Sequence, residues 1–153
     1  MSELKSTPLF DISITVDPPQ NLGATPLGMR RIVPVTGGSF KGERVSGIVM
    51  PNAAADWILV RADGSIQLDV RLTLKTDDGE LIYMNYRGIR NSSPEVSERL
   101  ANGELVDPSE YYFRTAPVFE TGADKYAWMN NIISVAVGTR VPTEVRYKIF
   151  EIL

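Results

Sequence analysis

The sequence predicts an all-β fold: one closed antiparallel β-barrel of about nine strands with one short helix, in a single domain over residues 1–153. Three observations support this prediction. Apolar and polar residues alternate in many short segments, turn-forming residues separate these segments, and only one stretch has helical spacing. This pattern is typical of a barrel or a sandwich and not of an alternating βαβ fold. We expect a barrel because closure leaves no exposed strand edge, and a sandwich is the alternative.

Five strands are expected in the first half of the chain. They cover residues 9–16, 30–35, 45–50, 57–60 and 66–75. The last is the clearest, because its apolar residues from Ile66 to Leu74 alternate with polar ones without interruption. The first ends at Asp17-Pro18-Pro19, since proline has no N–H for the ladder. Residues 20–27 are expected to form a loop, and Gly37-Gly38 to end the second strand.

Four strands and a helix are expected in the second half. The strands cover residues 81–89, 111–119, 132–137 and 145–152. Pro117 should interrupt the second of these, because proline is confined to edges and bulges. A capping serine and a proline in the first turn predict one short helix within residues 91–103. Residues 120–131 are expected to form a loop or a single helical turn.

The composition excludes several classes of function. The chain has no His and no Cys, which rules out disulfides, thiolate and imidazole catalysis, Ser-His-Asp triads and zinc fingers. Any catalysis must then use carboxylates, Tyr, Lys, Arg, a hydroxyl group or a bound cofactor. The net charge of −3 provides no positive field to recruit nucleic acid. No segment has the apolar length of a signal peptide or a membrane span, so we expect a cytoplasmic protein without a membrane partner.

Charged residues around one hairpin form the first candidate site. Asp56, Trp57, Arg61, Asp69 and Arg71 lie on the two strands that flank a single turn. An arginine fork can hold a carboxylate or a phenolate, and a carboxylate beside an indole in a dry pocket has a raised pKa, which suits it to acid–base catalysis. The alternative is that Asp69 and Arg71 form an ordinary ion pair on the outer face.

Aromatic residues crowd the second half of the chain and form the second candidate site. They are Tyr83, Tyr86, Tyr111, Tyr112, Phe113, Phe119, Tyr126 and Trp128. Such rings line many small-molecule pockets, and a tyrosine hydroxyl can donate to a developing enolate; core packing is the alternative for any single ring. The segment from Tyr126 to Asn131 is expected to cap a pocket, to plug one end of the barrel, or both.

Four segments occur in order along the chain: GMRRIVPVTGGSFKG, DWILVRADGSIQLDVRLTLKTDDG, YYFRTAPVFETGADKYAWMNN and VAVGTR. Together they resemble the bacterial and fungal domain-of-unknown-function 3237 family, and the resemblance extends from about Leu9 to Ile152. It implies a compact β-barrel and, by analogy with some relatives, a setting among aromatic or polycyclic small molecules. The positions that match the family's motifs, without an assigned role, are Arg30, Asp56, Trp57, Asp69, Arg71, Tyr83, Arg114, Trp128 and Asn131.

Two functions fit these residues. In the first, the chain is a cofactor-independent isomerase, cyclase, hydratase or lyase that acts on a hydrophobic carbonyl or phenolic compound, with Asp56 or Asp69 as the base. Arg71 or Arg30 would hold an oxyanion, and Tyr83 would donate a proton. In the second, it is a non-catalytic carrier or sensor of a small apolar or aromatic ligand. The expected ligand contacts are Arg30, Trp57, Arg61, Arg114, Tyr126, Trp128 and Asn131, with no metal and no cofactor. A homo-oligomer built through apolar strand faces is a third alternative.

Overall fold

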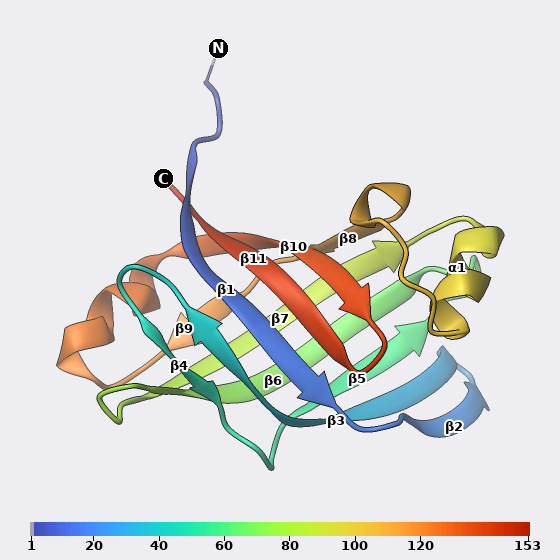
Figure 1. The fold of residues 1–153 in the computed structure, drawn as a ribbon, viewed down its shortest axis with the longest axis horizontal. Helices are drawn as coiled ribbons and strands as arrows, with labels where there is room; N and C mark the ends of the chain where they lie inside the picture. Colours follow the sequence, from blue (N-terminus) through green and yellow to red (C-terminus); the bar gives the residue numbers. More distant parts are fainter. Residues whose placement is uncertain (1) are drawn as a thin grey trace.

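The computed structural model describes residues 2–153, and the predicted all-β class is confirmed (Figure 1). The strands are β1 (Ser6–Val16), β2 (Gln20–Thr25), β3 (Gly28–Lys41), β4 (Ser46–Val49), β5 (Ala55–Val60), β6 (Ile66–Thr76), β7 (Leu81–Asn91), β8 (Tyr112–Thr115), β9 (Val118–Glu120), β10 (Ile133–Val141) and β11 (Glu144–Ile152). The helices are α1 (Pro94–Ala101) and the 3-10 helices η1 (Pro108–Glu110) and η2 (Asp124–Asn131).

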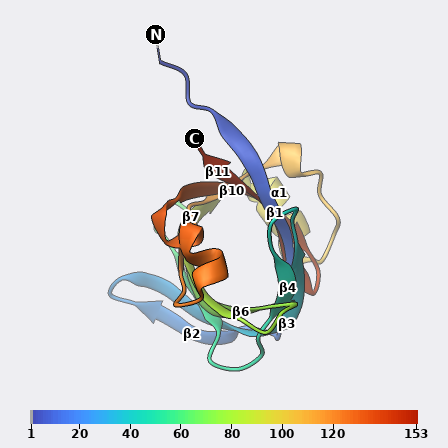
Figure 2. The same ribbon diagram turned by 90° about the vertical axis from the view of Figure 1, so that its left-hand side faces the viewer.

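Eight of the strands close into an antiparallel barrel, which Figure 2 shows end on. Around the ring they follow the order β6, β5, β3, β1, β11, β10, β8 and β7, and the pairing of β7 with β6 closes the circle. This last pair is a long regular ladder that runs from Ile66 opposite Arg90 to Lys75 opposite Leu81. The fold is therefore a barrel and not a sandwich, and the ring has eight strands where about nine were predicted.

The three remaining strands extend the barrel wall. β5 pairs with the N-terminal parts of β3 and β6, and β4 pairs with the C-terminal parts of the same two strands. The two short strands therefore share one position in the ring. In the same way β8 and β9 follow one another along β7, and Pro117 separates them, as predicted. β2 pairs only with β3 and lies outside the ring.

Two predicted details of the N-terminal half are wrong. Residues 20–27 contain β2 and its turn, although no alternation marked them, because none of the β2 residues is buried. The predicted stop at Gly37-Gly38 is also absent, and β3 runs on to Lys41. Gly38 has φ +141°, and a Cβ there would lie 2.0 Å from the carbonyl oxygen of Ser13. Glycine thus lets β3 pass close to β1 instead of ending the strand.

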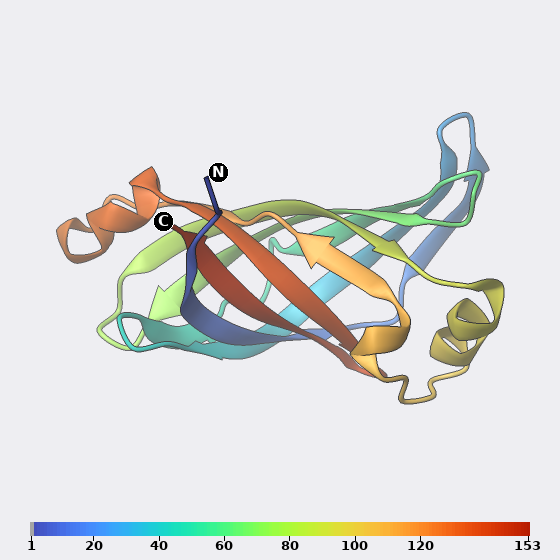
Figure 3. The same ribbon diagram turned by 90° about the horizontal axis from the view of Figure 1, so that it is seen from above.

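The two ends of the barrel are built differently. Figures 1 and 3 show η2 at one end of the barrel and α1 at the other. At the η2 end the interior is apolar: the ring of Phe10 packs against those of Phe40 and Phe119, with centroids 5.1 and 5.8 Å apart. The Tyr126 hydroxyl of η2 donates a hydrogen bond to Oδ1 of Asp78 (2.7 Å), which ties η2 to the turn between β6 and β7. Hollows lined by inward-facing side chains lie toward the α1 end, where the interior becomes polar.

Gly138 supplies a test of the packing beneath that pocket. A Cβ at residue 138 would lie 2.7 Å from the ring of Phe113, which is itself fully buried. We expect Gly138→Ala to lower the free energy of unfolding by about 1 to 3 kcal/mol, the usual effect of overpacking a core. The matched control is Gly122→Ala, where a Cβ would meet no atom within 4 Å. Urea denaturation that gave the same midpoint for both variants would contradict this account of the core.

Candidate functional site

The α1 end of the barrel encloses three adjoining hollows, which we call the α1-end cavity. Two of them have volumes of about 360 and 320 Å³, and both are lined by Arg31, Ile66, Arg90 and Arg140. The third, of about 30 Å³, lies deeper in the barrel and includes Asp56 in its wall. The size of the two outer hollows is in the range of small-molecule sites, which start at roughly 300 Å³.

Strand register explains why charged side chains point into this cavity. Side chains alternate between the two faces of a strand, and directly opposed residues on neighbouring strands share a face. Asp56 lies opposite the buried Val33 and Val70, so it faces inward. By the same rule Arg90 shares the inner face with Tyr86 on β7, and Arg140 shares it with Ala136 on β10.

Asp56 occupies a local opening in the ladder between β5 and β6. The ladder has no paired residues between Asp56↔Val70 and Leu59↔Gln67, although the register is the same on both sides. There the N–H of Asp69 donates to Oδ1 of Asp56 (3.1 Å), and Nη1 of Arg30 donates to the carbonyl of Trp57 (3.1 Å). The side chains of Asp56 and Arg30 thus hydrogen-bond to backbone groups that the ladder leaves unpaired. The bond from the Asp69 N–H fixes the Asp56 carboxyl group at the inner end of the cavity.

Burial raises the pKa of Asp56 from 3.8 to about 7. The hydrogen bond from the Asp69 N–H and the charges of Arg90 and Arg140 oppose this effect but do not cancel it, while the charge of Asp69 adds to it. Loss of hydration disfavours the charged carboxylate, whereas donors and cations favour it. The carboxyl group therefore exchanges its proton near neutral pH, the range in which an acid–base catalyst works best.

Two tyrosines lie beside Asp56 at the inner end of the cavity. The rings of Tyr86 and Tyr147 pack edge to face with centroids 5.2 Å apart, and both side chains are buried. Burial raises the pKa of each phenol well above its usual range, and the Asp56 charge adds to the effect in both. Both hydroxyl groups therefore stay protonated and can act as neutral hydrogen-bond donors.

Arginines dominate the middle of the cavity. Burial and the neighbouring charge of Arg140 lower the pKa of Arg90 to about 10. The Arg90 guanidinium lies over the Phe113 ring, 5.9 Å from its centroid. Arg140 is held in place through its backbone N–H, which donates to the Tyr111 hydroxyl (3.0 Å). The positive charges of Arg90 and Arg140 thus lie close enough together to repel each other.

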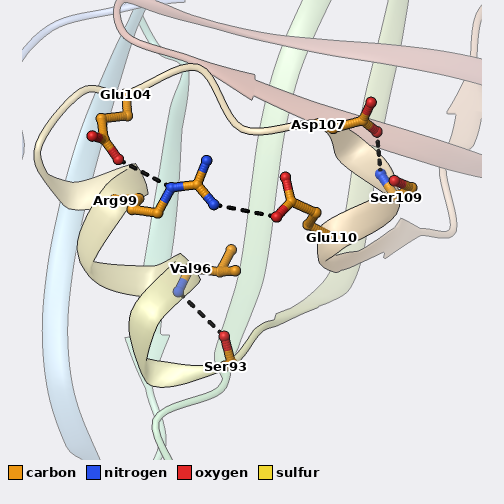
Figure 4. A network of polar contacts seen from close by, with 7 residues as sticks. All are labelled: Ser93, Val96, Arg99, Glu104, Asp107, Ser109 and Glu110. Atoms are coloured by element: carbon orange, nitrogen blue, oxygen red, sulfur yellow. Dashed lines mark hydrogen bonds and ion pairs between the residues drawn. The ribbon is translucent and has the colours of Figure 1, made fainter.

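Residues of α1 line one side of the cavity, and Figure 4 shows the polar contacts that join this helix to η1. Arg99 of α1 binds both Glu104 and Glu110, with N–O distances of 3.1 and 3.2 Å, and so ties the helix to η1. The helix begins at a standard cap, in which Oγ of Ser93 accepts the N–H of Val96 (3.2 Å). Exposed ion pairs add little stability, but here they join α1 to the segment that follows it.

Of the four residues predicted to be catalytic, only Asp56 lines the cavity. Asp69, Arg71 and Tyr83 alternate with buried residues of β6 and β7 and therefore face outward, so the expected convergence of the four is not observed. The hydrophobic side of each strand was recognised, but the charged residues of the opposite, outer side were assigned to the pocket. A shift of one residue moves a side chain to the other face of the sheet.

The predicted ligand contacts are scattered. Trp57, Arg30 and Arg114 lie on the outer face; Arg114 donates to the carbonyl of Phe113 (3.0 Å). Arg61 follows β5 and donates to Oγ of Ser65 (2.8 Å). The three predicted residues of η2 belong to the opposite end of the barrel, where Trp128 packs against Arg44 (4.0 Å from guanidinium carbon to ring centroid). These are Tyr126, Trp128 and Asn131.

The prediction missed the arginines of the cavity and gave Tyr86 no specific role. A signal was present: Tyr86 continues the inward alternation of Ile82 and Met84, and two further steps lead to Arg90. In the β10–β11 ladder Arg140 lies opposite Val145 and Tyr147 lies opposite Gly138, so both side chains share the inner face. The prediction ended the first of these strands at Val137, four residues before its end at Val141, and so hid this common face.

A larger hollow of about 470 Å³ lies elsewhere, on the outer surface of β1, β3 and β11. Its polar lining includes Ser13 and Arg146, which are already bound to Glu144. We therefore place the candidate site in the α1-end cavity. Within residues 2–153, no group of three acidic side chains is arranged to hold a metal ion. The helices of this part of the chain are too short or too polar to cross a lipid bilayer.

The sequence matches known proteins along nearly its whole length. The family described as "Protein of unknown function (DUF3237)" matches residues 4–152. A UPF0311 protein of Clostridium acetobutylicum is 39% identical over 153 residues, which cover 99% of this chain and 96% of the relative. A UPF0311 protein of Rhodopseudomonas palustris is 35% identical over 150 residues, with coverage of 98% and 97%.

Solved structures share the fold. A conserved protein of unknown function from Rhodopseudomonas palustris superposes with a TM-score of 0.96 at 35% identity, and both chains are covered completely. A β-barrel-like protein from Acinetobacter baumannii gives 0.86 at 37% identity, with coverage of 100% and 98%. An enzyme from Penicillium herquei has the same fold, with a TM-score of 0.71 at 19% identity and coverage of 97% and 96%. The resemblance predicted from the four motifs is confirmed, and the chain belongs to the DUF3237 family of proteins of unknown function.

Proposed function

We propose that the chain is a cofactor-independent enzyme that moves a proton on a small, mostly apolar carbonyl or phenolic compound, with Asp56 as the general base. One observation carries this proposal: a carboxyl group with a pKa of about 7 lies at the inner end of a cavity, beside two buried phenols and two arginines. Acids and bases with shifted pKa values in a cleft are the usual mark of acid–base catalysis. The fold is compatible with catalysis, since an enzyme from Penicillium herquei also has it.

The proposed step is proton abstraction next to a carbonyl group. The Asp56 carboxylate takes a proton from the carbon, the electron pair of the C–H bond forms a C=C bond, and the carbonyl oxygen becomes an enolate. The charges of Arg90 and Arg140 stabilise the new oxyanion. In a β,γ-unsaturated carbonyl compound the enolate is conjugated with the second C=C bond, so return of the proton from Asp56 to the γ-carbon moves that bond to the α,β position. Atoms and charge then balance without a cofactor.

Tyr86 and Tyr147 complete this arrangement as neutral donors. Because burial holds both phenols protonated, they can hydrogen-bond an enolate without first losing a proton themselves. They take the role that the sequence assigned to Tyr83, which lies on the outer face. A carrier would use the same cavity without a proton transfer. Measurement of proton exchange in D₂O distinguishes the two functions.

The titration of Asp56 is the first prediction. The folded protein should bind the Asp56 proton more tightly than the unfolded chain between pH 3.8 and about 7, so this group lowers stability as pH rises through that window. We expect Asp56→Asn to be stabilising relative to the parent by about 2 to 4 kcal/mol at pH 8, and to lose that advantage at pH 4. Chemical denaturation at both pH values measures the difference.

The pKa of the Asp56 carboxyl group can also be measured directly from carboxyl ¹³C resonances. The resonance that is absent from the Asp56→Asn spectrum should titrate near pH 7 in the parent. A midpoint below pH 5 would show that the carboxyl group is not sufficiently desolvated to serve as the proposed base.

The second prediction concerns catalysis. In D₂O, the parent should accelerate exchange of the protons next to the carbonyl in at least one of three probes: phenylpyruvate, phenylacetone and 2-tetralone. We expect Asp56→Asn to reduce the enzymatic rate by about 10²-fold or more, which is typical for loss of a general base. The rate in the parent should rise with pH up to about 7, as Asp56 ionises. ¹H NMR follows the exchange.

Asp69→Asn is the matched control, because that side chain faces outward while its backbone N–H still holds Asp56. It should keep a rate close to that of the parent, with the pH profile shifted slightly to lower pH because the Asp69 charge no longer raises the pKa of Asp56. If the parent and the Asp56→Asn protein exchange all three probes at equal rates, Asp56 is not a base and the carrier function is favoured.

A further inference from the structure

Three arginines face the α1-end cavity without an acidic partner. Within residues 2–153, the side chains of Arg31, Arg90 and Arg140 take part in none of the observed ion pairs, which all join other residues. They also donate none of the side-chain hydrogen bonds of this part of the chain. All three line both outer hollows of the cavity. Among the described residues, the donor groups of these three side chains therefore have no acceptor in the protein, although they line the cavity.

The acidic residues around the cavity do not neutralise these charges. Glu98 on α1 and Asp17 after β1 are exposed residues of the rim, and neither pairs with an arginine. Asp56 lies deeper and carries its proton for much of the time at neutral pH. The cavity thus holds more positive than negative charge. Partly buried guanidinium groups that are close to one another and unpaired are unfavourable, and a bound anion would relieve both problems.

We propose that the α1-end cavity binds a small substrate through a carboxylate group, which Arg90 and Arg140 hold and which Arg31 meets at the entrance. This inference deepens the proposed function, since it names the substrate class of the same cavity. Arginine presents a planar fork of donors that matches a carboxylate with two parallel hydrogen bonds. The Phe113 ring lies under the Arg90 guanidinium, which keeps that fork oriented.

The other walls of the cavity indicate the chemical character of the rest of the substrate. Val16, Val33 and Ile58 line both the 320 Å³ hollow and the deep hollow that contains Asp56. An apolar body would pack on these side chains, with the carboxylate on the guanidinium groups and the reacting carbon toward Asp56. The enolate oxygen would then be hydrogen-bonded by Tyr86 and Tyr147, while the arginine charges stabilise it from a greater distance. The deep hollow of about 30 Å³ leaves space there for little more than one small group. A nucleotide or another large polyanion would not fit, because its several charges would have to face an apolar wall.

Ligand binding tests the inference without any turnover. Phenylacetate is the probe, and phenylacetamide is its neutral counterpart with nearly the same shape. We expect phenylacetate to bind at least tenfold more tightly, and Arg90→Gln and Arg140→Gln each to weaken it by about tenfold or more while leaving phenylacetamide unaffected. ¹H–¹⁵N chemical-shift titrations give the affinities and show whether the perturbed residues line the cavity.

Arg87→Gln is the matched control, because Arg87 is on the same strand as Arg90 but is exposed on the outer face. It should bind phenylacetate like the parent. Arg90→Lys provides a second variant if Arg90→Gln does not fold: it keeps the charge but loses the fork, and affinity should again fall. The inference is overturned if phenylacetate does not bind in the millimolar range, if the amide binds equally well, or if Arg87→Gln weakens binding as much as the cavity variants.

The outcomes for the two proposals can be distinguished. Phenylacetate should also bind to Asp56→Asn, so anion binding without any proton exchange would refute the proposed function alone. Exchange of the neutral ketones together with no preference for the carboxylate would refute the present inference alone. Inorganic phosphate serves as a further probe: binding at least tenfold tighter than phenylacetate, with the same dependence on Arg90 and Arg140, would show that the site selects phosphate and would overturn the assignment to a carboxylate.

Discussion

The closure of the sheet by β6 and β7 is the constraint on which the rest of the structure depends. Their ladder joins the two ends of the strand order and so turns a sheet into a barrel. An eight-stranded barrel has an interior that side chains nearly fill, so each inward position either completes the core or shapes a pocket. At the η2 end large apolar residues complete the core, including Tyr126 and Met129 of η2. Toward the α1 end polar side chains take the inward positions, and the interior opens into a cavity.

The chemistry of that cavity follows from how its charges are buried. Asp56, Arg90 and Arg140 lie close enough for their charges to affect one another, yet no two of them form a salt bridge. Water is partly excluded, so the carboxyl group tends to keep its proton and the guanidinium groups lack a counter-ion. A chain without His or Cys reaches a pKa near neutrality in this way. The proposed proton transfer depends on the desolvated carboxyl group, and the proposed anion binding depends on the unpaired guanidinium groups of the same cavity.

Much of the fold could be predicted from local pattern. The alternation over residues 66–75 and 81–89, with a turn between them, correctly gave the hairpin that closes the barrel. The interruption at Pro117 and the short capped helix were also predicted, because both depend on local backbone chemistry. β2 was missed because its residues have no buried face, and the run of β3 through Gly37-Gly38 was missed because glycine also permits close strand contact.

The candidate site was predictable only in part. Asp56, a predicted site residue, lines the cavity, but it was grouped with Asp69 and Arg71, which face away from it. The arginines that do lie beside it come from β7 and β10, far away in the sequence. Sequence spacing gives the period of a strand but not which of its neighbours will oppose it. By itself, the sequence determined the all-β class, most strand positions and the absence of His and Cys chemistry. Only the tertiary structure decided which face is inside and which charges meet, because register between distant strands is set by closure of the whole ring.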